Sequence, residues 1–262
     1  MAVKVGNASI SENGTIRGSA GDQNGREVYI RNWYLRKEEW YTLIPTDPNM
    51  LEYIALAMER ACKNDDIGYD QNENRTLWNN VRDKGYDPAK TTKKVETDCA
   101  ELAALCAQYA LVMTGKTGVV VADSYTANLA ANLVKTGYFK KLTADKYTNK
   151  DDYLLRGMIQ VTRKKGHAWV VLSNGEKASL KEFYAEEPKP VEPQPEAPAV
   201  PDYNTFTIAD GTWNVRSGPG TKYDSVGRVK GGMKVEGVDT DGWVPIKFEE
   251  KVRWIGPSAV KR

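Results

Sequence analysis

The sequence predicts an α+β domain, with helices packed on an antiparallel sheet, followed by a small all-β barrel. Apolar residues recur at helical spacing in residues 47–62, and residues 158–172 are typical of paired strands. A proline-rich acidic segment holds half of the chain's 12 prolines, which predicts an extended tether between two folded parts. We therefore expect a domain over residues 1–184, a tether over 185–202 and a second domain over 203–262.

The N-terminal part begins with a predicted strand at residues 28–34. Asp47 and Pro48 then predict a helix start, because aspartate caps free N–H groups and proline suits the first helical position. The helix has one apolar face, and we expect its Cys62 to fill the core, as free cysteines usually do. Residues 128–135 are typical of a second, short helix.

Strand patterns dominate the end of this first part. Residues 158–162 and 167–172 are predicted strands joined by a short basic turn that ends in Gly166. An Asn174-Gly175 pair follows, and such pairs favour a tight hairpin turn. We therefore expect a third antiparallel strand directly after residue 175.

The composition excludes several classes of function. A net charge of +2 gives no basic face for nucleic acid, and no apolar run is long enough to enter a membrane. The first residues lack a charged head followed by an apolar stretch, so we expect no signal peptide. Three cysteines and one histidine make neither a disulfide framework nor a usual zinc site. We expect no metal and no cofactor.

Cys99 is placed at the predicted start of a helix. Asp98 and Glu101 have the spacing of a capping-box variant, and apolar residues continue at helical spacing after them. A thiol at the positive end of a helix dipole favours the thiolate, with pKa values of roughly 3.5 to 7.5 in such positions. We expect Cys99 to be a nucleophile; the alternative is that it is merely buried, like Cys62.

His167 is the only histidine in the chain. It opens a predicted strand directly after Gly166, and strand alternation places it on one face with Trp169 and Val171. A histidine at this position can face a helix start, where its imidazole would take the proton of a cysteine and return it to a leaving amine. We therefore predict a Cys99–His167 pair.

Three stretches in this order resemble the NlpC-type papain-like cell-wall peptidases, and phage endolysins of that group in particular. They are Gly68-Tyr69-Asp70-Gln71 with Arg75, Thr97-Asp98-Cys99, and the stretch from Lys165 to Leu172. The resemblance spans roughly residues 18 to 182. It implies a papain-like fold that hydrolyses an amide of the peptidoglycan stem peptide through a cysteine thioester, without a cofactor.

The resemblance also implies roles for further residues. Tyr69 matches a tyrosine that the family places near the oxyanion, and Gln71 beside it can donate a hydrogen bond. The residue that orients the histidine falls at Ser179, a weak hydrogen-bonding partner for this role, with Glu182 as the rival. Asn174 is excluded by distance, because seven residues of strand at ~3.3 Å each place it more than 20 Å away.

Residues 203–262 resemble a bacterial Src-homology-three-like domain. The match lies in Asn214-Val-Arg-Ser-Gly-Pro-Gly220, a Gly-Trp step and a late Trp-Ile-Gly strand. Such domains bind cell-wall peptide or glycan, so Tyr223, Trp243 and Trp254 are candidate wall-binding aromatic residues. For Trp243 a core position is the favoured alternative.

The sequence thus predicts a monomeric endolysin that acts on Gram-positive peptidoglycan. The family implies that it stays in the host cytoplasm until it is released to the wall. The sequence does not choose between an amidase, which cuts before the first L-alanine, and an endopeptidase within the peptide. Two other functions stay open: a non-catalytic wall-binding protein, and a cysteine acyltransferase such as a transpeptidase or transglutaminase.

Overall fold

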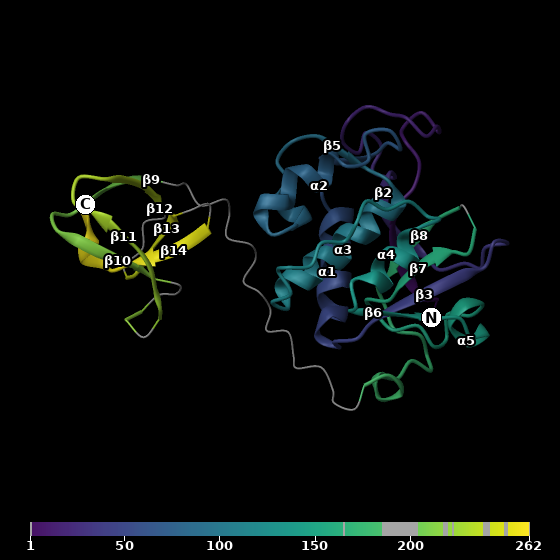
Figure 1. Ribbon diagram of the computed structural model, residues 1–262. Helices are drawn as coiled ribbons and strands as arrows, with labels where there is room; N and C mark the ends of the chain where they lie inside the picture. The colour runs from purple at the N-terminus through teal and green to yellow at the C-terminus, as the bar shows by residue number, and fades with distance from the viewer. Residues whose placement is uncertain are drawn as a thin grey trace. The chain divides into compact units, whose positions relative to one another are not determined.

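The N-terminal and C-terminal parts of the chain fold as two separate units. The computed structural model describes residues 2–164, 166–184, 204–216, 220–221, 223–237, 242–248 and 251–261. The units are Met1–Pro193 and Gln194–Arg262 (Figure 1). The predicted tether, residues 185–202, lies outside the described residues.

A six-stranded antiparallel sheet forms the centre of the first unit. Its strand order is β2-β1-β8-β7-β3-β6. The strands are β1 (Lys4–Ala8), β2 (Val28–Asn32), β3 (Trp40–Pro45), β6 (Phe139–Leu142), β7 (Ile159–Thr162) and β8 (Ala168–Val171). A separate two-stranded parallel ribbon joins β4 (Ile67–Tyr69) to β5 (Val95–Thr97). The predicted strands near residues 28, 158 and 167 are confirmed.

The helices of this unit include two long ones and several short ones. The α-helices are α1 (Asn49–Cys62), α2 (Thr76–Val81), α3 (Cys99–Met113), α4 (Leu129–Lys135) and α5 (Asp145–Thr148). Short 3₁₀ helices cover Arg82–Lys84, Pro88–Lys90 and Leu180–Glu182. α1 begins at Asn49 with Pro48 in the N-cap position, one residue later than predicted, and the Asp47 carboxylate accepts a hydrogen bond from the Asn49 N–H at 2.9 Å.

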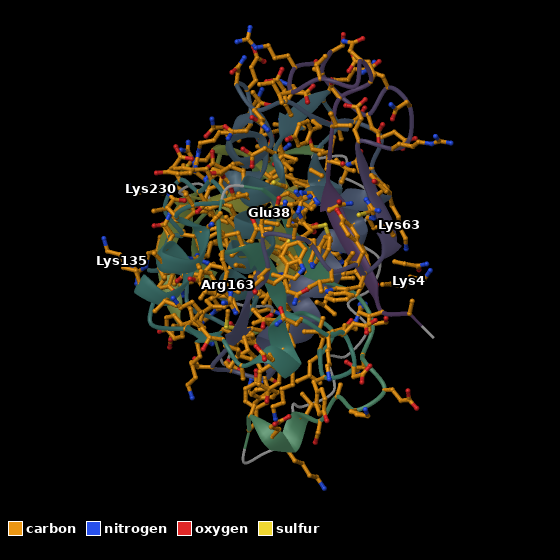
Figure 2. All side chains as sticks on the ribbon, turned by 90° about the vertical axis from the view of Figure 1, so that its right-hand side faces the viewer. Lys4, Glu38, Lys63, Lys135, Arg163 and Lys230 are labelled. Carbon is orange, nitrogen blue, oxygen red and sulfur yellow. The ribbon has the colours of Figure 1, made fainter. Side chains whose placement is uncertain are left out.

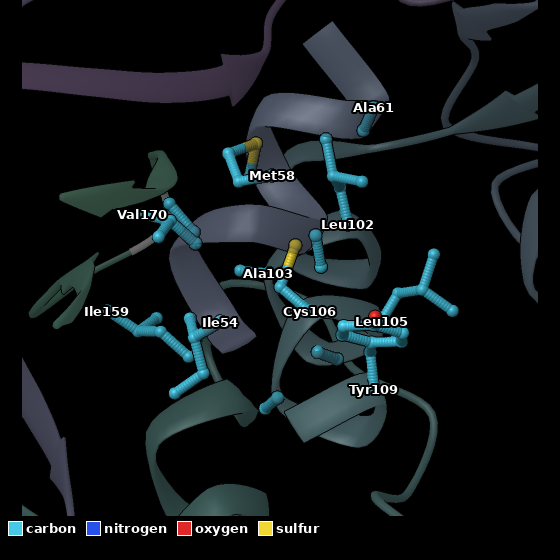
Figure 3. Packing of buried hydrophobic residues seen from close by; sticks show 14 of the residues in the cluster. Ile54, Met58, Ala61, Leu102, Ala103, Leu105, Cys106, Tyr109, Ile159 and Val170 are labelled. Atoms are coloured by element: carbon cyan, nitrogen blue, oxygen red, sulfur yellow. The ribbon is translucent and has the colours of Figure 1, made fainter. Parts of the chain in front are cut away.

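Apolar residues fill both faces of the sheet. On one face α1 and α3 pack together, and Met58 and Cys106 lie among aliphatic side chains of the two helices (Figure 3). On the other face Trp40 and Trp169 stack with their ring centroids 4.0 Å apart. Charged side chains such as Lys4, Lys63 and Lys135 project outward (Figure 2).

The predicted third strand after residue 175 is wrong. The second edge of β8 is taken by β1, with Val5 opposite Val171, so a returning strand has no partner there. The chain after Gly175 instead bonds to the loop before β7, through Gly175 N–H to Leu154 O and Lys177 N–H to Asp152 O. It then forms the 3₁₀ helix Leu180–Glu182.

The second unit is all-β in its described residues apart from one 3₁₀ turn, Pro257–Ala259. Its strands are β9 (Asn204–Ile208), β10 (Thr212–Arg216), β11 (Ser225–Lys230), β12 (Lys234–Gly237), β13 (Val244–Phe248), β14 (Lys251–Ile255) and β15 (Val260–Lys261). They form one sheet in the order β11-β10-β14-β13-β12-β9-β15 around a small apolar core. Tyr223 is exposed, and Trp243 and Trp254 are half-buried, so the wall-binding role of these residues and the alternative core position of Trp243 stay predictions.

No helix in the described parts of the chain combines the length and apolar character needed to cross a bilayer.

Candidate active site

Cys99 is the first residue of α3, as predicted. The Asp98 carboxylate caps this helix, with one oxygen accepting from the Ala100 N–H at 2.8 Å and the Glu101 N–H at 2.9 Å. Its second oxygen accepts from the Asn74 side-chain amide at 2.7 Å. These bonds fix the start of the helix, and with it the position of the Cys99 side chain.

Glu101 does not complete the expected capping box. One of its oxygens instead accepts from the Arg75 guanidinium at 2.8 Å and from the Ser124 N–H at 2.6 Å. Arg75 also contacts Asp123 at 3.0 Å. Glu101 therefore ties the loop before α4 to α3, and helix capping falls to Asp98 alone.

The expectation of a stable Cys99 thiolate is wrong. The side chain is 7% exposed, and burial, followed by the nearby Asp98 charge, raises the pKa of the thiol to about 12. The backbone N–H groups of Ala168, Ala100 and Cys99 itself act in the opposite direction but are outweighed. Cys99 is therefore a neutral thiol in the free protein.

His167 stands directly before β8 and is 8% exposed. Its Nε2 atom lies 2.8 Å from the Oδ1 atom of Asn7 in β1. The Asn7 amide nitrogen donates to the Tyr29 carbonyl at 2.9 Å, so Oδ1 must be the atom that faces the ring. Nε2 therefore carries the proton, and Nδ1 keeps the free lone pair of a base.

Burial lowers the pKa of His167 to about 4, and the charges of Arg36 and Arg31 lower it further in the same direction. Both members of the predicted pair are thus neutral near pH 7. Within the described residues no hydrogen bond joins the Cys99 sulfur to the His167 ring. The sulfur lies instead beside the amide of Ala168, the residue that follows His167. The structure therefore brings Cys99 at the start of α3 close to the start of β8, without a hydrogen bond between the Cys99 and His167 side chains in the described residues.

Tyr69 reaches Cys99 through the β4–β5 ribbon. The parallel register places Tyr69 beside Thr97, two residues before Cys99. Burial, followed by the charge that Cys99 carries once it is ionised at high pH, raises the pKa of the Tyr69 phenol. Gln71 is exposed, and its side-chain amide donates to the Tyr69 hydroxyl at 2.8 Å. Tyr69 and Gln71 thus form one polar group beside the cysteine.

Ser179 and Glu182 do not occupy the position beside His167. Ser179 is exposed and precedes a 3₁₀ helix, while Glu182 is paired with Lys146. The partner of the ring is Asn7, which lies 160 residues before it in the chain. Sequence reasoning missed Asn7 because only the pairing of β1 with β8 brings it there.

A buried acidic cluster supports the ribbon that carries Tyr69. Glu27 accepts from the Tyr69 N–H at 3.1 Å, and Asp70 accepts from the Gly18 N–H at 3.2 Å. Glu96 is 2% exposed, and neither of its carboxyl oxygens has a hydrogen-bond partner among the described residues. Burial, followed by Glu27 and Asp70, raises the pKa of Glu96 to about 8. Glu96 is therefore mostly protonated at neutral pH.

This protonation makes the stability of the first unit depend on pH. A carboxyl whose folded pKa exceeds its ordinary value contributes stability below about pH 4.5, and the contribution is lost as pH rises through about 8. We expect Glu96→Gln to remove this loss and to stabilise the unit at pH 9 by on the order of 3 kcal/mol. Urea denaturation at pH 6 and pH 9 measures the effect, with the exposed Glu73→Gln as control. Equal losses of stability in the wild type and Glu96→Gln would contradict it.

Comparison with known proteins places the N-terminal part of the chain in a family. The model of the endolysin-like domain matches residues 5–178, about two thirds of the chain. The chain belongs to the endolysin-like domain family. The matched range of the endolysin-like domain includes Asn7, Tyr69, Cys99 and His167, and it ends one residue before Ser179. Membership indicates a phage protein that lyses cell walls, with peptidoglycan as its substrate. A search of curated proteins finds no significant match to this endolysin-like chain.

Proposed function

We propose that the chain is a cysteine peptidoglycan hydrolase in which Cys99 attacks an amide carbonyl of the stem peptide. The observation that carries the proposal is the bond from His167 Nε2 to Asn7, which leaves Nδ1 as a base at the start of β8, where the Cys99 sulfur lies beside the Ala168 amide. A cysteine at a helix start, a histidine beside it and an amide that orients the histidine are the parts of a papain-like site. The N-terminal domain is accordingly proposed to be papain-like and of NlpC type.

The reaction begins with two neutral groups. As the sulfur forms its bond to the carbonyl carbon, the thiol proton passes to Nδ1 of His167, so no isolated thiolate is needed in the buried site. The C–N bond then breaks, the imidazolium returns its proton to the leaving amine, and a thioester remains on Cys99. Water, deprotonated by the same nitrogen, hydrolyses the thioester and frees the thiol.

Two groups are placed to stabilise the oxyanion. The backbone N–H of Cys99 is at the N-terminus of α3, where helix N–H groups are unpaired and the helix dipole is positive. The Tyr69 hydroxyl lies on the same side, held by Gln71. We propose that these donors bind the oxygen that gains charge during attack.

Analysis of the released products tests this function. Purified Gram-positive walls are digested in water enriched in ¹⁸O, and the soluble fragments are analysed by mass spectrometry. For each new free amine we expect one new carboxyl group that carries one ¹⁸O atom. An amine on L-alanine identifies an amidase, and any other amine identifies an endopeptidase. New reducing sugar ends without new amines would overturn the proposal, and amides formed with an added amine would indicate an acyltransferase.

One observation favours a second function. Cys99 and His167 are both nearly buried and lack a direct hydrogen bond in the described structure. A non-catalytic wall-binding protein with the fold of an enzyme would show the same features. Release of amines from walls, and its dependence on Cys99, separates the two functions.

The all-β unit is proposed to be a bacterial Src-homology-three-like domain that binds the wall. Tyr223 is exposed and Trp254 on β14 is half-buried, so their rings can contact a ligand. A wall-binding unit on the same chain raises the enzyme concentration at an insoluble substrate. We expect Trp254→Ala to reduce cosedimentation of the full chain with purified walls by about tenfold. Unchanged cosedimentation would remove Trp254 from the binding surface.

A further inference from the structure

One cationic side chain, that of Arg31, lies on the same face of the sheet as Asn7, the partner of His167. In the pairing of β1 with β2, Asn7 is opposite Tyr29 and Val5 is opposite Arg31. Gly6 faces Met58 of α1, whereas Val5 belongs to the cluster on the other face of the sheet with Trp169. Because side chains alternate along a strand, Tyr29 and Arg31 share the face of Asn7. Arg31 therefore lies on the face of the sheet where Asn7 contacts the His167 ring.

Arg31 is held in place by aromatic residues and not by an acid. Its guanidinium lies 4.3 Å from the centroid of the Tyr34 ring, and one terminal nitrogen donates to the Tyr29 hydroxyl at 3.3 Å. Tyr34 in turn packs edge-on against Trp169, which is also in edge contact with the His167 ring. This chain of aromatic contacts fixes the guanidinium relative to the histidine.

The charge of Arg31 has no carboxylate partner within the described residues. Comparable half-buried arginines are paired: Arg36 with Glu38 at 3.0 Å, and Arg75 with Glu101 at 2.8 Å. The Nε atom of Arg31 is buried and has no hydrogen-bond partner there. A ligand cannot reach this buried atom, so the terminal nitrogens are the donors that the half-buried side chain can offer, and side by side they match the spacing of a carboxylate.

We infer that Arg31 binds a carboxylate of the substrate, so that the site prefers an acidic stem peptide. The inference rests on the proposed function and adds a specificity residue to it. The ligand class is a peptide with a free carboxylate near the cleaved amide, such as the side group of a glutamate within the stem. A carboxylate accepts from two guanidinium nitrogens at once, whereas a carboxamide offers a single neutral oxygen.

The test uses two synthetic muramoyl stem peptides that differ only in a glutamate carboxylate or carboxamide. We expect the wild type to cleave the carboxylate peptide with a kcat/KM about 10- to 100-fold higher. Arg31→Gln should lose this preference by slowing cleavage of the carboxylate peptide alone, and Arg31→Lys should keep part of it. Arg26→Gln, at an exposed loop arginine, is the matched control and should behave as the wild type.

Equal cleavage of the two peptides by the wild type, or equal loss on both in Arg31→Gln, would overturn the inference and leave the hydrolase intact. A binding measurement separates it from failure of the proposed function. Calorimetry with Cys99→Ala should show that the carboxylate peptide binds more tightly than the carboxamide peptide. Adding Arg31→Gln to Cys99→Ala should abolish this difference in affinity. The result does not depend on whether the wild type cleaves either peptide. Equal binding of both peptides, or binding of neither, would also overturn it.

Discussion

Replacing Cys99 with alanine should abolish the release of amines from purified walls, with a rate at least about 10³-fold below the wild type. The sulfur is the only protein atom in the proposed mechanism that forms a covalent bond to a substrate carbon, so no neighbour can replace it. The substitution removes one atom from a residue at the first position of α3, and the Asp98 cap bonds to Ala100 and Glu101 are unaffected. The variant should therefore fold and still sediment with walls.

Cys62 provides a matched control for this experiment. It is a free, half-buried cysteine at the end of α1, and burial raises the pKa of its thiol to about 12, as it does for Cys99. Cys62→Ala should release amines at the wild-type rate. If Cys99→Ala releases amines as fast as the wild type while both variants bind walls, the nucleophile is another group. If none of the three proteins releases amines, the chain is a non-catalytic wall-binding protein.

The protonation of the pair limits how this site can work. Burial raises the pKa of Cys99 to about 12 and lowers that of His167 to about 4, so burial disfavours both charges of a thiolate–imidazolium pair. An ion pair at rest would need direct contact between the two groups, and no hydrogen bond joins them in the described part of the chain. In the proposed mechanism, substrate binding brings the thiol and Nδ1 together, so that charge develops only while the proposed oxyanion donors contact the substrate.

Local patterns in the sequence were sufficient to place Cys99 at a helix start and His167 directly before a strand. Asp98 caps a helix whatever surrounds it, and Gly166-His167 precedes an apolar run that forms a strand. The pKa of Cys99 was predicted wrongly because helix position is visible in a sequence, whereas the burial that outweighs it depends on tertiary packing.

The hydrogen-bond partner of the His167 ring could not be found from local patterns. β1 is five residues long and contains Gly6 and Asn7, which weaken a strand signal, so nothing in the sequence marked residues 4–8. The resemblance to a known family pointed to Ser179 on a returning strand, but in this chain β1 occupies that edge of β8. A partner 160 residues away follows from sheet order, which a single sequence does not specify.

Asn7→Ala should lower kcat by about 10²-fold with little change in KM, whereas Ser179→Ala should stay within about twofold of the wild type. Without Oδ1 the Nε2 proton has no acceptor, and the imidazole can rotate or take the tautomer that puts the proton on Nδ1, where it cannot accept from the thiol. Because Asn7 is fully buried and also binds the Tyr29 carbonyl, its loss should reduce stability by about 1–3 kcal/mol.

Thermal melting of both variants separates this loss of stability from the loss of catalysis, and assays well below the lower melting temperature keep every variant folded. Ser179 is exposed beside the 3₁₀ helix Leu180–Glu182, so its hydroxyl should contribute to neither quantity. A large fall in kcat for Ser179→Ala, with Asn7→Ala unaffected, would mean that the active enzyme places a different strand beside His167. Equal falls in kcat for both variants would mean that neither side chain orients the ring alone.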